Sequence, residues 1–268
     1  MTVTAEVGST ASLPAQLAVL IGDARVLRVV RDADLPSAAA DLAVGPALLR
    51  RVADRPGEAW LRLYRPLPTV GFSRRDTREP GFAAAATAAT GLGFEPAVRA
   101  PGGRAAAYHR STVCFDLVLP DHGTDPVGRL AALGEVLTAV LVGLGVDARL
   151  GPVPDEYCPG RFSVNGGGRG KIAGTAGRRV RGALLLGGSI VVADAAPLRE
   201  VIEVVYRELG VAVDTATVAA ATDFGFTGPV STLVDELVAT LSHSVATQPA
   251  ALPADVLAVS RAVPPLVP

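Results

Sequence analysis

The 268-residue sequence has almost no lysine, few cysteines, no excess of one charge and no long apolar run. Two cysteines, Cys114 and Cys158, are too few for the disulfide framework of a small secreted protein. The net charge is −1 without blocks of like charge, so we expect neither nucleic acid nor a membrane as the main partner. The most apolar uncharged stretch, 182–193, is too short to cross a bilayer. The N-terminus lacks the basic and apolar segments of a secretory signal. These absences predict a cytoplasmic protein.

The scarcity of lysine makes the exception informative. Lys171 is the single lysine among 25 basic residues, and the others are arginines. Arginine replaces lysine wherever only a surface charge is needed, but not where a compact ammonium must fit a tight site. One lysine could survive by chance, but its glycine-rich surroundings favour a functional site at Lys171.

The spacing of apolar residues predicts a sheet of hairpins with helices between groups of strands. This is an α+β fold with a mixed, mostly antiparallel sheet flanked by helices. We expect an N-terminal extension over 1–34, a single catalytic domain over 35–245 and a flexible tail over 246–268. Helices are predicted over 37–52 (with Asp34 or Ser37 as N-cap), 81–92, 124–144, 198–209 and 229–244. Strands are predicted over 24–30, 59–64, 69–72, 95–99, 105–109, 112–119, 161–164, 171–176 and 182–192.

The segment NGGGRGK, residues 165–171, resembles two phosphate-binding motifs but fits neither. A P-loop needs glycine where Asn165 stands and a hydroxyl where Ile172 stands. A dinucleotide fingerprint leads into a helix, whereas this segment leads into a predicted strand. We therefore interpret 166–170 as a hairpin turn. The small residues that follow Lys171, among them Gly174, Thr175 and Ala176, would let a substrate approach the backbone closely.

A second candidate region is RAPGGRAAAYH, residues 99–109. The amides of Gly102 and Gly103 could converge on an anion or a carbonyl oxygen. Arg99 and Arg104 could bind a phosphate in bidentate fashion. His109 follows the glycine loop and is a candidate binding residue, although a histidine in a strand is more often structural.

The third candidate is Cys158, in the loop EYCPG shortly before the lysine strand. A nearby ammonium favours the thiolate, which is the nucleophilic form of cysteine. A loop cysteine without any role fits the pattern equally well. Cys114, in an apolar strand, is predicted to be an inert core residue.

The three segments, in this order, resemble the biotin/lipoate protein ligase superfamily on its lipoate ligase and octanoyltransferase side. The strands 61–65, 69–74 and 181–190 are similar too, and the resemblance covers about 35–225. It implies a class II synthetase-type domain that attaches a lipoyl or octanoyl group to a lysine of a lipoyl-carrier domain. The carrier would be a 2-oxoacid dehydrogenase E2 lipoyl domain or the glycine cleavage H protein, with an acyl-carrier protein as a candidate donor.

The resemblance also implies residue roles. The lysine matching Lys171 contacts the acyl carbonyl, and the phosphate where an adenylate forms, while the glycines matching Gly102 and Gly103 line the acyl pocket. This chain departs from the ligase pattern, which commonly has a third glycine where Arg104 stands and often adds an accessory domain after the catalytic one. Cys158 falls where the cysteine-dependent octanoyltransferases carry their nucleophile. The basic glycine signature of biotin ligases is missing.

Three mechanisms remain open from the sequence. The first is an ATP- and Mg²⁺-dependent ligase that forms lipoyl-AMP. The second is a transferase that carries the acyl group as a thioester on Cys158 and needs no nucleotide. The third is a non-catalytic lipoyl-binding subunit. We predict no resident metal in any of them.

Overall fold

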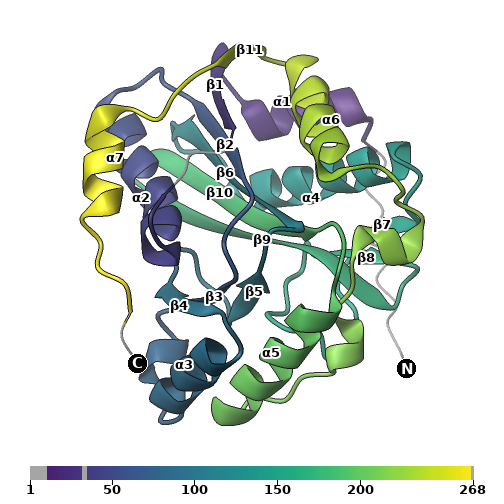
Figure 1. Ribbon diagram of the computed structural model, residues 1–268. Helices are drawn as coiled ribbons and strands as arrows, with labels where there is room; N and C mark the ends of the chain where they lie inside the picture. The colour runs from purple at the N-terminus through teal and green to yellow at the C-terminus, as the bar shows by residue number, and fades with distance from the viewer. Residues whose placement is uncertain (1–10, 32–34, 267–268) are drawn as a thin grey trace.

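The computed structural model describes residues 11–31 and 35–266 and has an eight-stranded sheet at its centre. Its strands are β1 (Val26–Arg31), β2 (Trp60–Tyr64), β6 (Thr112–Asp121), β7 (Ala148–Leu150), β8 (Val164–Gly166), β9 (Gly170–Val180), β10 (Gly182–Val191) and β11 (Ala246–Pro249). They lie in the order β11-β1-β2-β6-β10-β9-β8-β7 (Figure 1). Only the pairs β11–β1 and β1–β2 are parallel, so the sheet is mixed and largely antiparallel. The predicted α+β class is confirmed.

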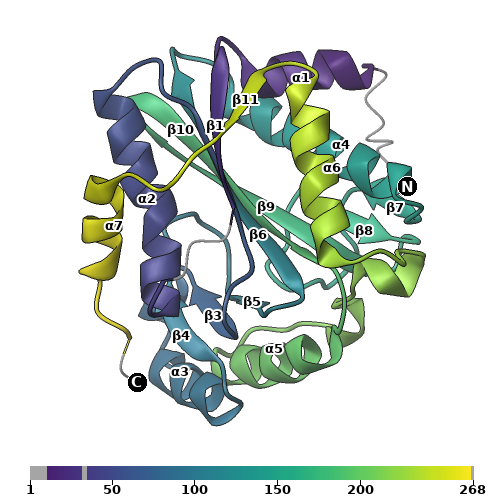
Figure 2. The same ribbon diagram turned by 45° about the horizontal axis from the view of Figure 1, so that its top comes forward.

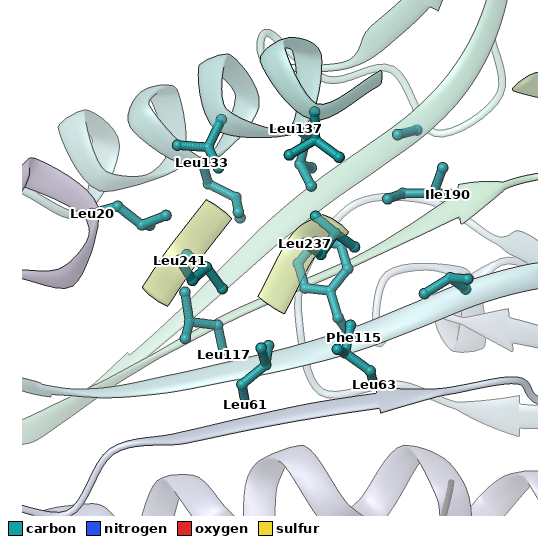
Figure 3. Close-up of a cluster of buried hydrophobic side chains, with 14 of the residues drawn as sticks. Leu20, Leu61, Leu63, Phe115, Leu117, Leu133, Leu137, Ile190, Leu237 and Leu241 are labelled. Carbon is teal, nitrogen blue, oxygen red and sulfur yellow. The ribbon is translucent and has the colours of Figure 1, made fainter. Parts of the chain in front are cut away.

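Three helices cover one face of this sheet: α1 (Leu13–Ile21), α4 (Pro126–Gly143) and α6 (Val230–Ser242). The apolar core lies here, because alternate residues of β2 and β6 point to this side. Helix α4 is long and apolar enough to cross a membrane by composition, but it packs against α1, α6 and the sheet as a core helix. Figure 3 shows the contributing side chains Leu61, Leu63, Phe115 and Leu117 from the strands and Leu20, Leu133, Leu137, Leu237 and Leu241 from the helices.

The opposite face of the sheet is divided between two structures. Helix α2 (Ala38–Asp54) packs on β6 and β10, and α7 (Ala254–Arg261) packs on α2. A second sheet, in the order β4-β3-β5, lies further along with α3 and α5 beneath it (Figures 1 and 2). These elements are β3 (Thr69–Phe72), β4 (Glu95–Val98), β5 (Ala106–Tyr108), α3 (Phe82–Gly91) and α5 (Ala196–Glu208).

The described residues of the expected extension and tail, 11–31 and 246–266, pack on the main body. Helix α1 packs on α4, and β1 pairs with β2 inside the main sheet. Strand β11 adds a parallel edge to β1, and α7 packs on α2. The short polar strand β11 has no local signal, because only its distant partner β1 gives it hydrogen bonds. Of the two proposed N-caps for α2, Ser37 accepts from the Ala40 amide, and Asp34 lies outside the described residues.

Most predicted elements have the expected type, with ends shifted by at most four residues. The clearest difference is the strand predicted over 161–164, which is β8 at 164–166. The predicted turn after it is present, with Gly167 and Gly168 at positive φ. Gly166 and Gly170 are more than flexible turn residues, because a Cβ on Gly166 would lie 2.1 Å from the Phe224 ring and one on Gly170 would lie 3.1 Å from it. Their hydrogens make room for that ring.

The contribution of α7 to the core can be measured with two valines on the same helix. Val256 is 2% exposed and packs in the α2 core, whereas Val259 is 45% exposed. We expect Val256→Ala to lower the free energy of unfolding by about 2 kcal/mol, because it leaves a cavity. Val259→Ala is the matched control and should change it by less than about 0.5 kcal/mol. Urea denaturation of both variants checks this, and equal effects would contradict the packing described.

Candidate functional site

A cavity of about 270 Å³ lies on the second face of the main sheet, beside α2 and the second sheet. Its walls come from β2, β6, β9 and β10 and from the loops 101–103 and 157–160. Sequence segments more than 100 residues apart therefore meet around one space. Eight of the predicted site residues line it: Arg99, Gly102, Gly103, Cys158, Lys171, Gly174, Thr175 and Ala176.

Lys171 is buried in the wall of this cavity, with 2% of its surface exposed. Its Nζ donates to Oε1 of Glu156 at 3.0 Å and to the carbonyl oxygens of Tyr157 at 3.0 Å and Cys158 at 2.7 Å. An ammonium has three N–H donors, so all of them are used within the protein. Lys171 therefore holds the loop that carries Cys158. The contact with an acyl carbonyl that the family resemblance implies stays a prediction.

Glu156 is the second half of this anchor and is also fully buried. Its Oε1 accepts from Ser163 Oγ at 2.6 Å and from the Gly160 amide at 3.1 Å, and its Oε2 accepts from the Val153 amide at 3.0 Å. We call residues 153–163 the Cys158 loop. The loop is wrapped around one carboxylate, which in turn neutralises the buried ammonium of Lys171.

The backbone of the Cys158 loop is held in an unusual conformation. Asp155 and Cys158 have φ values of 56° and 41°, a region that residues other than glycine rarely occupy. Such strain persists only where surrounding contacts fix it, and it is common at functional sites. One further contact is the Cys158 amide, which donates to the Tyr206 hydroxyl at 2.6 Å, and that hydroxyl donates to the Ala105 carbonyl at 2.9 Å.

The thiol of Cys158 faces two hydrogen-bond donors. Nη2 of Arg99 lies 3.4 Å from Sγ, and the Arg104 amide lies 3.3 Å from it. The guanidinium of Arg99 is itself fixed by the carbonyl oxygens of Arg104 and Pro101. Negative charge on the sulfur, or on an oxygen beside it, therefore meets a preorganised cation and an amide. Gly103 allows this approach, because a Cβ there would lie 2.7 Å from both Sγ and Nη2.

Cys114 also lines the cavity but has a different environment. Burial raises the pKa of its thiol well above the ordinary value, and the charges of Asp116 and Asp41 raise it further. Cys114 is therefore a neutral thiol at neutral pH, consistent with the inert role predicted for it. Of the two cysteines, Cys158 has the surroundings of a nucleophile.

Two predicted binding residues do not enter the cavity. His109 bonds through Nε2 to the Asp194 carbonyl at 2.8 Å, and its Nδ1 accepts from the Ser111 amide at 3.2 Å. It fixes a turn, which is the structural role that the sequence left open. The side chain of Arg104 pairs with Asp76 and Glu79, and its backbone amide faces the Cys158 sulfur. Arg104 lines the second cavity described below.

A second cavity of about 340 Å³ adjoins the first outside the Cys158 loop. The two share Pro101, Gly102, Gly103 and Pro159 in their walls. Arg74 and Arg75 line the second one, and neither has a side-chain partner in the described part of the chain. This space can accept an anionic group near Cys158.

Glu156 and Asp116 were not predicted from the sequence as site residues. Glu156 stands two residues before Cys158, and a buried lysine requires a counter-charge, so this pairing had a signal. Asp116 had none, since it lies in the middle of an apolar strand and its place in the cavity depends on the strand order of the sheet.

The family model for the lipoyl protein ligase A/B catalytic domain matches residues 37–223. The chain belongs to this family. Lipoate-protein ligase A bound with ATP has a similar structure, with a TM-score of 0.69 and 21% identity over 89% of this chain and 92% of that one. The bi-partite lipoate protein ligase from Thermoplasma acidophilum gives a TM-score of 0.68 and 20% identity over 89% and 90% of the two chains. LipL1 from P. falciparum gives a TM-score of 0.61 and 13% identity over 89% of this chain and 71% of that one. No curated protein matches the sequence significantly.

In this member of the lipoyl ligase family, substitutions at two adjacent glycines test the contacts that hold the Cys158 thiol. Gly103 has φ 106° and no room for a Cβ, whereas a Cβ on Gly102 meets nothing within 4 Å. We expect Gly103→Ala to lower the free energy of unfolding by about 1–3 kcal/mol. It should also slow iodoacetamide alkylation of Cys158 about tenfold, because the sulfur loses charge-assisted hydrogen bonds.

Gly102→Ala is the matched control for stability and should change the free energy of unfolding by less than about 0.5 kcal/mol. Urea denaturation and mass spectrometry of the alkylated protein give the two readouts. Equal stability of the two variants would contradict the described contact of Gly103 with the thiol.

Proposed function

We propose that this protein transfers an acyl group of octanoyl or lipoyl size to a lysine of a lipoyl-carrier domain, with Cys158 as the nucleophile. The observation that carries the proposal is the position of the Cys158 sulfur. It lies in the cavity wall between the Arg99 guanidinium and the Arg104 amide, on a strained loop anchored by Lys171 and Glu156. A thiol with such partners is typical of covalent catalysis.

The reaction has two balanced halves. The Cys158 sulfur attacks the carbonyl of an acyl thioester, the donor thiolate leaves, and the proton of the Cys158 thiol ends on that donor thiol. The carrier lysine amine then attacks the acyl-Cys158 carbonyl, an amide forms, and the amine proton ends on the Cys158 sulfur. No nucleotide is consumed.

Groups of this protein stabilise the negative charge that develops in both half-reactions. Arg99 and the Arg104 amide lie beside the sulfur. Each tetrahedral intermediate carries its oxyanion on the carbon bonded to that sulfur, so both donors are close to the negative charge. The backbone at Gly102 and Gly103 borders the same space. Lys171 contributes indirectly, by fixing the carbonyls of Tyr157 and Cys158 and therefore the direction of the thiol.

The partners follow from the family and stay part of the proposal. The archaeal bi-partite ligase was described together with its E2 lipoyl domain, which supports a lipoyl domain or the glycine cleavage H protein as acceptor here. An acyl-carrier protein is the proposed donor, and Arg74 and Arg75 in the second cavity suit the phosphate of its prosthetic group. We propose that the reaction takes place in the cytoplasm.

An ATP-dependent ligase is the second candidate, because a ligase of similar fold was solved with ATP. The arginines of the second cavity suit a phosphate and would hold the nucleotide there. Bound ATP would supply the activation of the acid as an adenylate. In the described part of the chain the lining of this cavity contains no carboxylate, and the carboxylates of Asp76 and Glu79 beside it pair with Arg104. Mg²⁺ would therefore be held mainly by the nucleotide phosphates and water. Lipoate-dependent ATP–pyrophosphate exchange is the discriminating assay.

The covalent route predicts an acyl-enzyme that can be weighed. With an octanoyl thioester and no acceptor, the intact mass should rise by one octanoyl group, and peptide mapping should place it on Cys158 and not on Cys114. Cys158→Ala should lose the adduct and at least about 10³-fold of the turnover, because the nucleophile is removed.

Two results would contradict the thioester route. One is an unchanged rate of carrier acylation by Cys158→Ala. The other is transfer from lipoate plus ATP by both proteins alike, which would assign the ligase mechanism. The wild-type protein without thioester is the mass control.

A further inference from the structure

Strand β9 carries a second basic side chain, besides Lys171, that reaches a loop of the site. Nη1 of Arg178 donates to the Ala100 carbonyl oxygen at 3.2 Å. Alternate residues of a strand share a face, so Arg178 is on the same side of β9 as Gly174, where a Cβ would lie 3.1 Å from Cε of Lys171. Gly177 faces the other side, since a Cβ there would meet a leucine of α4. The Arg178 side chain therefore extends from the main sheet to Ala100 on the cavity side.

The loop that Arg178 reaches carries both hydrogen-bond donors to the Cys158 sulfur. We call residues 99–105 the donor loop, because Nη2 of Arg99 and the Arg104 amide face Sγ at 3.4 and 3.3 Å. The bonds from the Arg99 guanidinium to the carbonyls of Pro101 and Arg104 lie inside this loop. They fix the shape of the loop, but they do not fix its position relative to the main sheet.

The donor loop is anchored from two sides. Four residues bind it from the side of the second sheet, through β3, the segment after β3 and α5: Phe72, Asp76, Glu79 and Tyr206. Within residues 11–31 and 35–266, the hydrogen bond from Arg178 is the one that ties the donor loop to the main sheet. Lys171 holds the Cys158 loop from the same strand. The sulfur and its donors thus lie on separate loops, and β9 holds both.

Arg178 has no carboxylate partner elsewhere in the described chain. Its side chain is half-buried, and its neighbour Arg179 is the one that pairs with Asp121. A guanidinium that donates to a carbonyl makes a charge-assisted hydrogen bond, which is stronger than a bond between neutral groups. The donor loop needs such an anchor, because Gly102 and Gly103 give its backbone more freedom than other residues would.

We propose that Arg178 is a positioning residue for Cys158. By holding the Ala100 carbonyl, it keeps the Arg99 guanidinium and the Arg104 amide against the sulfur, and it touches no substrate itself. Both donors favour the thiolate, so release of the donor loop leaves less of the nucleophilic form at neutral pH. The use of that thiolate for acyl transfer rests on the proposed function, whereas its reactivity toward other reagents does not.

The test is the pH profile of iodoacetamide alkylation of Cys158 in the whole protein, with peptide mapping to separate it from Cys114. We expect Arg178→Met to slow alkylation at pH 7 at least about threefold and to move the half-plateau point to higher pH. The plateau rate at high pH should not change, because the sulfur is then fully ionised in both proteins. Arg178→Lys, which keeps a charged donor, should recover most of the rate.

Arg181→Met is the matched control, since it removes an exposed arginine just after β9 that has no bond to the donor loop in the described chain. Its profile should equal that of wild type. A remote charge acts on the thiolate through a field that salt screens, with a Debye length of about 3 Å at 1 M, whereas a displaced loop is insensitive to salt. The difference between Arg178→Met and wild type should therefore persist in 1 M NaCl.

The inference is overturned if the folded Arg178→Met keeps the wild-type profile, if the difference disappears in 1 M NaCl, or if Arg181→Met causes an equal shift. Near-ultraviolet circular dichroism checks folding. If Arg178→Met does not fold, Arg178→Gln, with a weaker neutral donor, is judged by the same criteria.

Acylation of Cys158 by an octanoyl thioester separates the inference from the proposed function. A shifted alkylation profile without any acylation of wild type supports the positioning role and contradicts the transfer mechanism. Acylation of wild type with an unshifted profile in Arg178→Met contradicts the positioning role alone.

Discussion

The buried ammonium of Lys171 is the interaction on which the rest of the site depends. A charge with 2% exposure is stable only when it is paired and fully hydrogen bonded, and Glu156 with two loop carbonyls provides this. Satisfying one side chain therefore fixes a whole segment, the Cys158 loop. These contacts hold Cys158 at its positive φ, and its sulfur is directed to the Arg99 guanidinium and the Arg104 amide.

The main sheet makes such a site possible because its two faces are used differently. One face carries the dry leucine core beneath α1, α4 and α6. On the other face, β2 carries Arg62, and β6 carries Cys114 and Asp116. Gly187 of β10 and Gly174 of β9 have no side chains to fill the space above their strands. Small residues toward the middle of the sheet leave the cavity open, and α2 and the second sheet close its sides. The fold thus provides one cavity that Cys158, Lys171 and Asp116 line together.

The parts of the site that are marked by neighbouring residues in the sequence were predictable. The single lysine, the glycine pair and Cys158 stand out in the sequence, and the structure brings them together. The pairing of Lys171 with Glu156 was not predictable, because it depends on a loop conformation. Asp116 and strand β11 were missed for a related reason, since each acquires its place from partners more than 50 residues away. His109 shows the converse: its motif position suggested binding, but its hydrogen bonds are structural.

We propose, as the central claim, that Lys171 acts through the Cys158 loop and not on the acyl carbonyl. The most direct test is the rate of Cys158 acylation by an octanoyl thioester in Lys171→Met, Glu156→Gln and the double variant, followed by intact mass. The account predicts that both single changes slow acylation to a similar extent and that the double variant is no slower than either, since all three release the same loop. Wild-type acylation by Glu156→Gln together with its loss in Lys171→Met would contradict it, because Lys171 would then act on the substrate directly.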